Sequence, residues 1–511
     1  MTLLPTFLNL VQQWRPCFAD YRTYHRAVGF ALTFLVCMGR RTISRAICAQ
    51  QRQFSSWASD YRLFSMSRWT PQHLFDVVLK LALKLMSPAQ PLVMALDDTI
   101  LRKTGRRIPK ASTLRDPLSP PYHTNLVWSL RFIQAVLLLW PVDGPGAARA
   151  IPIAFQLAPP VPKPKKKKTA VPANTSADKK DNHAANAKKV AQQKAADEEW
   201  KQYYKTRRLQ GLSAQGAALI RDMRSRLDHI ACYAELILWV VVDASYCNRT
   251  VLSRLPERTI VIGRTRKDIH LSALPQPQSG RGRRRCYGAD LGTPEQMRKD
   301  QSIPWQNATI FAAGRCHQLR YKSVGPVLWR RGAQRRQLRL IIIAPLAYHA
   351  HGHRLYRHPA YLLVTDPAAD VVQVLQAYFY RWEIEADQKE EKDLLGVGQA
   401  QVWSEKAVAR QPAFHVASYA MLLLAAIQCY GFNSITTLSR LPLWRHRKPP
   451  TRLSALHLIA RLRTELQSLD DPSPQPRRRK ISTHFPRALL EKQIGMKIPV
   501  TMRAILDSAW T

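Results

Sequence analysis

The sequence predicts an α/β fold in which helices flank a mixed sheet, with a helical region in front and a mostly β segment inserted. Three observations predict it. Apolar residues recur at a spacing near 3.6 from residue 1 to about 85, with few turn residues, which indicates helices. Two continuous apolar runs, 91–96 and 236–242, lead directly into aspartates, and such runs are typical of strands buried on both faces. Residues 259–366 have a β-like, arginine-rich pattern.

Charge narrows the class of partner. The chain has 511 residues with 78 Lys+Arg against 35 Asp+Glu, and 78 − 35 gives a net charge of +43. Its 46% hydrophobic content indicates a folded core and excludes a disordered chain. Charge of this size on a folded scaffold is unfavourable unless a polyanion neutralises it, so nucleic acid is the expected partner. An anionic membrane surface is the alternative, but no long amphipathic basic helix supports it.

Cysteine spacing and hydropathy bear on location. The eight cysteines include no C-x2-C pair, which argues against a zinc ribbon or a disulfide framework. The longest apolar runs, 27–39 and 416–427, are shorter than the roughly 18 residues that span a bilayer. We therefore expect a soluble, cytoplasmic protein.

Within the helical region, a glycine turn precedes a basic helix start at residues 39–45. This pattern suits a helix-turn-helix whose second helix enters a major groove, with Arg40 and Arg41 contacting DNA. A surface arginine cluster on an ordinary helical bundle is the alternative.

The next elements follow in order. Further strands are expected at 126–140 and 150–155, and residues 160–190 are predicted to be a disordered basic linker. From Lys163 to Arg208 there are 14 Lys/Arg and 5 Asp/Glu, a composition that adds sequence-independent affinity for phosphates or simply forms a solvated tail. Helical spacing returns at 197–228, and three strands are expected at 259–263, 338–343 and 361–365. Two long helices are expected between 371 and about 430, before a basic C-terminal region.

Three carboxylates carry the predicted chemistry. Asp98 and Asp243 end the two apolar runs, and a later helix carries Glu383 and Glu385. Acids at strand ends and on a covering helix converge at one sheet edge, and oxygen ligands of this kind suit Mg²⁺ or Mn²⁺. Two such ions can activate a nucleophile and stabilise the leaving oxygen in phosphodiester cleavage.

The glutamate helix has an ordered face. At about 100° per residue, Tyr378, Arg381, Glu385 and Lys392 share an arc of about 60°. A routine i,i+4 ion pair explains Arg381 with Glu385, but not the matching Tyr378 and Lys392.

These residues resemble a known family. Tyr378-x2-Arg381-x3-Glu385-x6-Lys392 matches the Y-x2-R-x3-E-x6-K signature of insertion-sequence transposases of the IS-four superfamily. The segments 96–99 and 241–246 look like that family's two aspartate motifs, so the resemblance covers about residues 90–430.

The resemblance implies a DDE transposase with an RNase H-like catalytic domain, a mixed five-stranded sheet flanked by helices. Asp98, Asp243 and Glu385 would hold two Mg²⁺ or Mn²⁺ ions, and Tyr378, Arg381 and Lys392 would contact DNA. The implied chemistry is hydrolytic release of a 3′-OH at each element end and its transfer into target DNA, by a homodimer on the bacterial nucleoid. The corresponding domains are a helical DNA-binding domain at 1–85 and a catalytic domain formed by 86–250 and 367–435. A β-rich insertion at 251–366 interrupts the catalytic domain, and residues 436–511 form a basic C-terminal region.

The first motif contains two aspartates, Asp97 and Asp98, which face opposite sides of a strand, so only one can enter the site. The family places its aspartate immediately before Thr, which selects Asp98 and leaves Asp97 outside the ligand set. Two competing functions share these features: a DNA-binding protein with an inactive catalytic domain, and a metal-dependent nuclease without strand transfer.

Weaker signals have structural alternatives. The alternating histidines at 349–353 could bind metal but fit a basic surface loop better. Trp305, Trp329 and Trp403 could stack on a flipped base, although a place in the core is their default. The arginine run 281–285 is expected to contact phosphates, with a solvated loop as the alternative.

Overall fold

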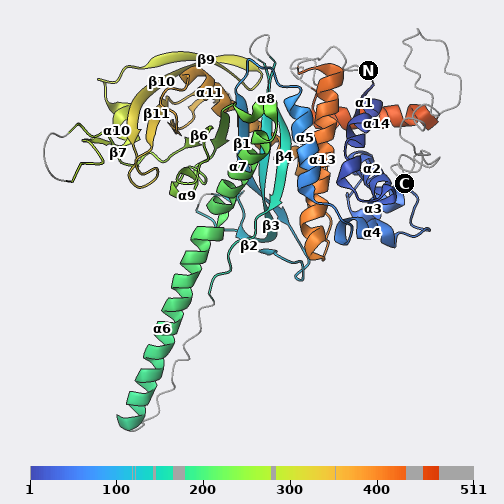
Figure 1. Ribbon diagram of the computed structural model, residues 1–511, viewed down its shortest axis with the longest axis horizontal. Coiled ribbons are helices and arrows are strands. Elements are labelled where there is room, and N and C mark those ends of the chain that lie inside the picture. Colours follow the sequence, from blue (N-terminus) through green and yellow to red (C-terminus); the bar gives the residue numbers. More distant parts are fainter. Residues whose placement is uncertain are drawn as a thin grey trace.

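The computed structural model describes residues 2–470 apart from residues 118, 121, 142–145, 165–178, 278–282, 351–352 and 433–452. It confirms the predicted fold class, because a large mixed sheet is flanked by helices and preceded by a helical region (Figure 1). Most of the C-terminal region predicted at 436–511 lies outside the described residues, except for α14 (Ala455–Asp470) and the residues just before it.

The helical region contains a 3₁₀ turn, Arg15–Cys17, and five helices: α1 (Leu3–Gln12), α2 (Tyr21–Val36), α3 (Ile43–Ala49), α4 (Ala58–Ser65) and α5 (Pro71–Leu83). Local capping explains where several begin. Asp20, Thr42 and Thr70 each accept a hydrogen bond from the backbone three residues on, which satisfies an N–H that the helix leaves unpaired. Aromatic rings of this region, including Trp14 and Phe64, pack against Phe414 in α13 (Glu405–Tyr430).

Five strands form the centre of the sheet, in the order β4-β3-β1-β5-β6. Their bounds are β1 (Leu92–Arg102), β3 (Leu126–Leu139), β4 (Arg149–Leu157), β5 (Leu238–Val242) and β6 (Thr259–Arg264). β3 is antiparallel to β1 and to β4, whereas β5 runs parallel to β1 and β6 parallel to β5. All five predicted runs in this part of the chain are strands.

Further strands, most of them from the segment predicted as the insertion, continue the sheet beyond β6. Beyond β6 the order continues β14-β11-β10-β7-β8, while β2 pairs with β3 and β9 with β10. The bounds are β2 (Ser112–Arg115), β7 (Leu271–Ser272), β8 (Asp290–Gly292), β9 (Gln306–Ala312), β10 (Arg315–Leu328), β11 (Gln337–Ile343) and β14 (Ala360–Val364), with a separate hairpin of β12 (Ala347–Ala350) and β13 (His353–Tyr356). β6, the first strand of the segment predicted as the insertion, pairs in parallel with β5 of the central strands.

The two faces of the sheet pack into different cores. On β1, Leu92, Met94 and Leu96 join the large core that contains α5, α7 and α13. Val93 and Ala95, which point the other way, join a second core. That second core includes residues of α11 (Val371–Tyr380) and α12 (Trp382–Asp393). Three helices therefore occupy 371–430, where two were expected.

One buried helix has the length and the apolar composition of a membrane-spanning helix. Among the described residues, α13 alone is long and apolar enough, so the expectation that the apolar runs are too short to span a bilayer is wrong. However, 83% of its most apolar stretch is buried inside the protein. Helix α13 lies beside α5 and β4, and its apolarity is that of a core helix (Figure 1).

Helix α6 (Lys179–Gln210) projects from the body and leads into α7 (Leu212–Asp228) (Figure 1). It starts inside the segment predicted to be disordered, so that prediction is wrong for residues 179–190, while 165–178 lie outside the described residues. Three short helices complete the fold: α8 (Ala231–Ala234), α9 (Arg249–Leu252) and α10 (Pro294–Lys299).

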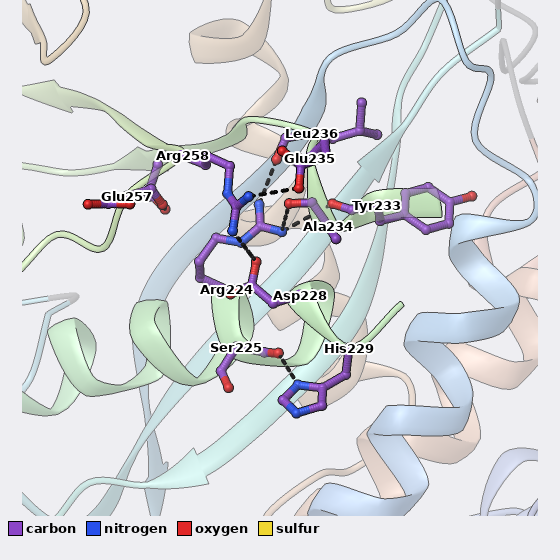
Figure 2. Close-up of polar contacts among 11 residues, drawn as sticks. Arg224, Ser225, Asp228, His229, Tyr233, Ala234, Glu235, Leu236, Glu257 and Arg258 are labelled. Carbon is purple, nitrogen blue, oxygen red and sulfur yellow. Dashed lines mark hydrogen bonds and ion pairs between the residues drawn. The ribbon is translucent and has the colours of Figure 1, made fainter. Parts of the chain in front are cut away.

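An arginine cluster holds the start of β5 in place. The buried Arg224 of α7 donates hydrogen bonds to the carbonyl oxygens of Tyr233, Ala234 and Leu236 and pairs with Asp228 at 3.0 Å (Figure 2). Arg258, just before β6, joins Asp228 from the solvent side. The guanidinium therefore satisfies the last carbonyls of α8 and fixes how the chain enters β5.

Candidate active site

Parallel pairing brings two aspartates to one place on the sheet. The register of β1 and β5 pairs Leu96 with Val242, and the next residue along each chain is Asp97 and Asp243. Neighbouring residues in register point to the same face. Asp97 continues the face of Val93 and Ala95, the face that α11 and α12 cover.

Asp243 is oriented by its own turn. The Ser245 backbone N–H donates to Oδ1 of Asp243 at 2.9 Å, and the Ser245 hydroxyl donates to Oδ2 at 3.0 Å. Both carboxylate oxygens are thus held by one residue two positions later, which limits the rotation of the side chain. Sequence reasoning did not single out Ser245, although the Asp-x-Ser spacing is a recognisable local side-chain-to-backbone motif.

Asp98 faces the opposite side of β1. Its Oδ2 lies 3.4 Å from Nε of Arg131 on β3, and the Tyr246 hydroxyl donates to its Oδ1 at 3.4 Å. Tyr246 is fully buried in the large core, away from α12. The contacts therefore favour Asp97 over Asp98 as the aspartate that shares a site with Asp243.

Arg381 links the strand to the glutamate helix. This residue lies between α11 and α12, where its Nη2 is 2.7 Å from Oε1 of Glu385 and its Nη1 is 3.5 Å from Oδ2 of Asp97. Its side chain is only 11% exposed. The helix predicted to be continuous through 378–392 is two helices joined at Arg381, and this junction is where the strand aspartate and the helix glutamate meet.

The other residues of the predicted stripe lie on either side of this junction. Lys392, half-buried on α12, is close enough to Asp97 for the two charges to interact. Burial lowers the pKa of Lys392, and Glu391, Asp393 and Asp97 oppose that shift. Tyr378 lies on α11, partly buried beside the second core with its ring against Phe379.

The surroundings of Asp97 disfavour its ionised form. The pKa of Asp97 is raised to about 7, first by burial and then by the neighbouring Asp243, against the opposing Arg381 guanidinium. Burial also raises the pKa of Asp98, and Asp243 adds to this shift, while Arg131 and the Tyr246 hydroxyl oppose it. Two neighbouring carboxylates with a single cation beside them are harder to ionise than isolated ones. A bound metal cation would favour their ionised forms instead.

The carboxylates of this site have the chemistry that suits a hard divalent cation. Carboxylate oxygens are the ligands that Mg²⁺ and Mn²⁺ prefer, and Asp97 with Asp243 supply them on one face of the sheet. Within the described residues, no group of three or more His, Cys, Asp or Glu side chains lies close enough together to hold one ion. At this site Glu385 is paired with Arg381.

The two arginines predicted to contact DNA in the helical region differ in exposure. Arg40 is exposed, whereas Arg41 is buried and donates through Nε to the Phe34 carbonyl at 2.9 Å. The Arg41 backbone N–H donates to Gln399 Oε1 at 2.7 Å. Arg41 therefore ties the start of α3 to α2 and to the loop after α12.

The residues singled out as weaker sequence signals lie in different surroundings. Trp305 is partly buried beneath Lys322, and Trp329 packs at the edge of the large core, whereas Trp403 is 66% exposed and not a core residue. His349 and His353 belong to the β12–β13 hairpin, while His351 lies outside the described residues, as do Arg281 and Gly282.

Comparison with known families agrees with this arrangement. The sequence profile of one family, the DDE superfamily endonucleases, matches residues 15–336, more than half of the chain. The chain belongs to this family. The match includes the helical region and both strand aspartates but ends before Glu385. No curated protein matches the chain.

Membership of the DDE superfamily endonucleases indicates the general class of activity. Enzymes of this superfamily act on DNA as nucleases or transposases and typically use divalent metal ions.

Proposed function

We propose that the protein is an insertion-sequence transposase of the IS-four type, which cleaves DNA at the element ends and joins the released 3′-OH to target DNA. The observation that supports this most is the in-register pair Asp97 and Asp243 on the face covered by the glutamate helix. The Y-x2-R-x3-E-x6-K signature supplies the finer assignment.

In this proposal Asp97, Asp243 and Glu385 hold two Mg²⁺ or Mn²⁺ ions, which supply Lewis-acid stabilisation of the phosphodiester oxygens when bound. The sequence motif favours Asp98 as the first ligand, and the contacts favour Asp97. Asp98 then supports the strand through Arg131 and Tyr246.

The chain's own residues bind and orient the DNA. Arg381 and Lys392 flank the acids, and both can contact phosphates of the scissile strand. Such contacts draw the Arg381 guanidinium away from Glu385, which leaves that carboxylate available as a ligand. Tyr378 and Arg40 would contact DNA further from the acids, with the protein acting as a homodimer on chromosomal DNA in the cytoplasm.

The test uses a labelled duplex that carries the DNA flanking the gene, incubated with the full chain and Mg²⁺. Cleavage at the element end followed by joined products supports the proposal. Cleavage without joining assigns a nuclease instead. Duplex binding with no cleavage in either Mg²⁺ or Mn²⁺ assigns a DNA-binding protein with an inactive site.

A further inference from the structure

A dense group of exposed arginines lies at the far edge of the sheet, away from the catalytic acids. Two loops contribute, one between β7 and β8 and one between β10 and β11. The arginine patch is defined here as Arg283, Arg284, Arg330, Arg331, Arg335 and Arg336. All six are exposed.

A side-chain contact links the two loops near where their strands pair. Strand β7 pairs antiparallel with β10 at Ser272 and Leu328, immediately before both loops leave the sheet. The Arg330 guanidinium lies over the Tyr287 ring, 5.6 Å from its centroid. Arg330 therefore lies against the first loop, at a residue three positions after Arg284.

The turn that carries four of them has a defined shape. The backbone N–H groups of Gly332 and Ala333 donate to the Trp329 carbonyl at 3.1 and 2.8 Å. Gly332 lies so close to the indole that a Cβ there would come within 2.0 Å of the Trp329 ring. The turn is thus compact and packed on a tryptophan, which limits the positions of the arginines it presents.

Neither of the two loops contains an acidic residue. No Asp or Glu occurs between Asp300 and Asp366, and none occurs in residues 273–289. Like charges held this close repel one another unless an anion lies between them. The patch is also all arginine, whose planar fork binds phosphate oxygens in a bidentate way that lysine cannot reproduce.

We propose that the arginine patch binds the phosphodiester backbone of duplex DNA outside the catalytic site. The inference rests on the proposed function only for the choice of DNA as the polyanion. Strands β5 and β7 are five spacings apart in the sheet, about 24 Å at about 4.8 Å each. This span corresponds to about seven base pairs of duplex beyond the cleavage point.

The experiment measures the affinity of the full chain for a fluorescent duplex of about 30 base pairs in EDTA, across a salt series. The variant Arg335→Gln/Arg336→Gln should lower the slope of log K against log salt by about 2, because each lost phosphate contact removes about 0.9. The matched control, Lys80→Gln/Lys84→Gln, removes two exposed charges at the C-terminal end of α5 and should leave the slope unchanged.

Three results would overturn the proposal. One is an unchanged slope in the arginine variant, and another is an equal fall in the lysine control, which would show a general charge effect. The third is loss of binding to phosphatidylserine vesicles with DNA binding intact, which would assign the patch to a lipid surface. If the wild-type chain binds no duplex at all, the proposed function itself fails. Thermal unfolding of each variant checks that the fold is retained.

Discussion

Asp97 on β1 and Asp243, the residue after β5, each directly follow the in-register pair Leu96 and Val242 of two adjacent parallel strands. The relationship places two carboxylates on the sheet face covered by α11 and α12. Because Arg381 reaches both Asp97 and Glu385, a single guanidinium connects the strand acid to the helix acid. This arrangement leads to the following predictions.

Replacement of Asp97 should abolish DNA cleavage. Asp97→Asn removes one carboxylate of the pair, and rates should fall at least a hundredfold, about 3 kcal/mol or more. The variant should be slightly more stable near neutral pH, because the raised pKa of Asp97 shows that its charge is disfavoured in the folded protein. Single-turnover cleavage of a labelled duplex and thermal unfolding measure both effects.

Asp98→Asn is the matched variant one residue away. It breaks the contact with Arg131 and should reduce cleavage much less than Asp97→Asn. Full activity in Asp97→Asn together with loss in Asp98→Asn would show that Asp98 is the ligand.

Replacement of Arg381 by lysine tests the junction between α11 and α12. The charge stays, but one ammonium cannot reach two carboxylates, or a phosphate, with the geometry of the guanidinium fork. Cleavage should fall by about 1–3 kcal/mol, the scale of a hydrogen bond to a charged group. If Arg381 were only a helix-surface partner of Glu385, worth about 0.2–0.5 kcal/mol, the variant would cleave almost normally.

Glu391 should make the fold pH-sensitive. This buried carboxyl accepts a hydrogen bond from Gln134 Nε2 at 2.7 Å, and burial raises its pKa to about 8 from an ordinary 4.5. The folded state binds the extra proton between these values, so this group's stabilisation is complete below about pH 4.5 and is lost as the pH rises through about 8.

Glu391→Gln should remove that dependence, at most about 1.4 kcal/mol per pH unit. Gln134 Oε1 is buried with no hydrogen-bond partner among the described residues, and the new amide can donate to it. Urea unfolding of both proteins at pH 6 and pH 8.5 measures the difference. A constant gap between wild type and variant at the two pH values would contradict the prediction.

Loss of Arg224 should be among the most damaging changes in the fold. Arg224→Ala leaves three carbonyls without their donor and leaves Asp228 with Arg258 alone, and should cost about 3–5 kcal/mol of unfolding free energy. Arg258→Ala is the control, since its side chain is 40% exposed and its ion pairs should contribute about 0–1 kcal/mol. Similar losses in the two variants, measured by urea unfolding, would contradict the assigned role of Arg224.

The sequence by itself determined the local elements. Continuous apolar runs before Asp97 and Asp243 indicate buried strands, and helical spacing places Glu385 on a helix with Arg381 one turn earlier. These patterns depend on neighbours within a few residues, so they can be read along the chain. The resemblance to a transposase family rests on the same short motifs.

Tertiary structure decided which of these residues meet. A strand alternates its faces every residue, so the choice between Asp97 and Asp98 depends on which face α12 covers, and α12 lies almost 300 positions later. The burial of Arg41 and the contact between the two arginine-bearing loops have the same origin, because each depends on contacts between distant segments. Side-chain periodicity is a local property of the backbone, whereas packing between segments selects the partner of each face.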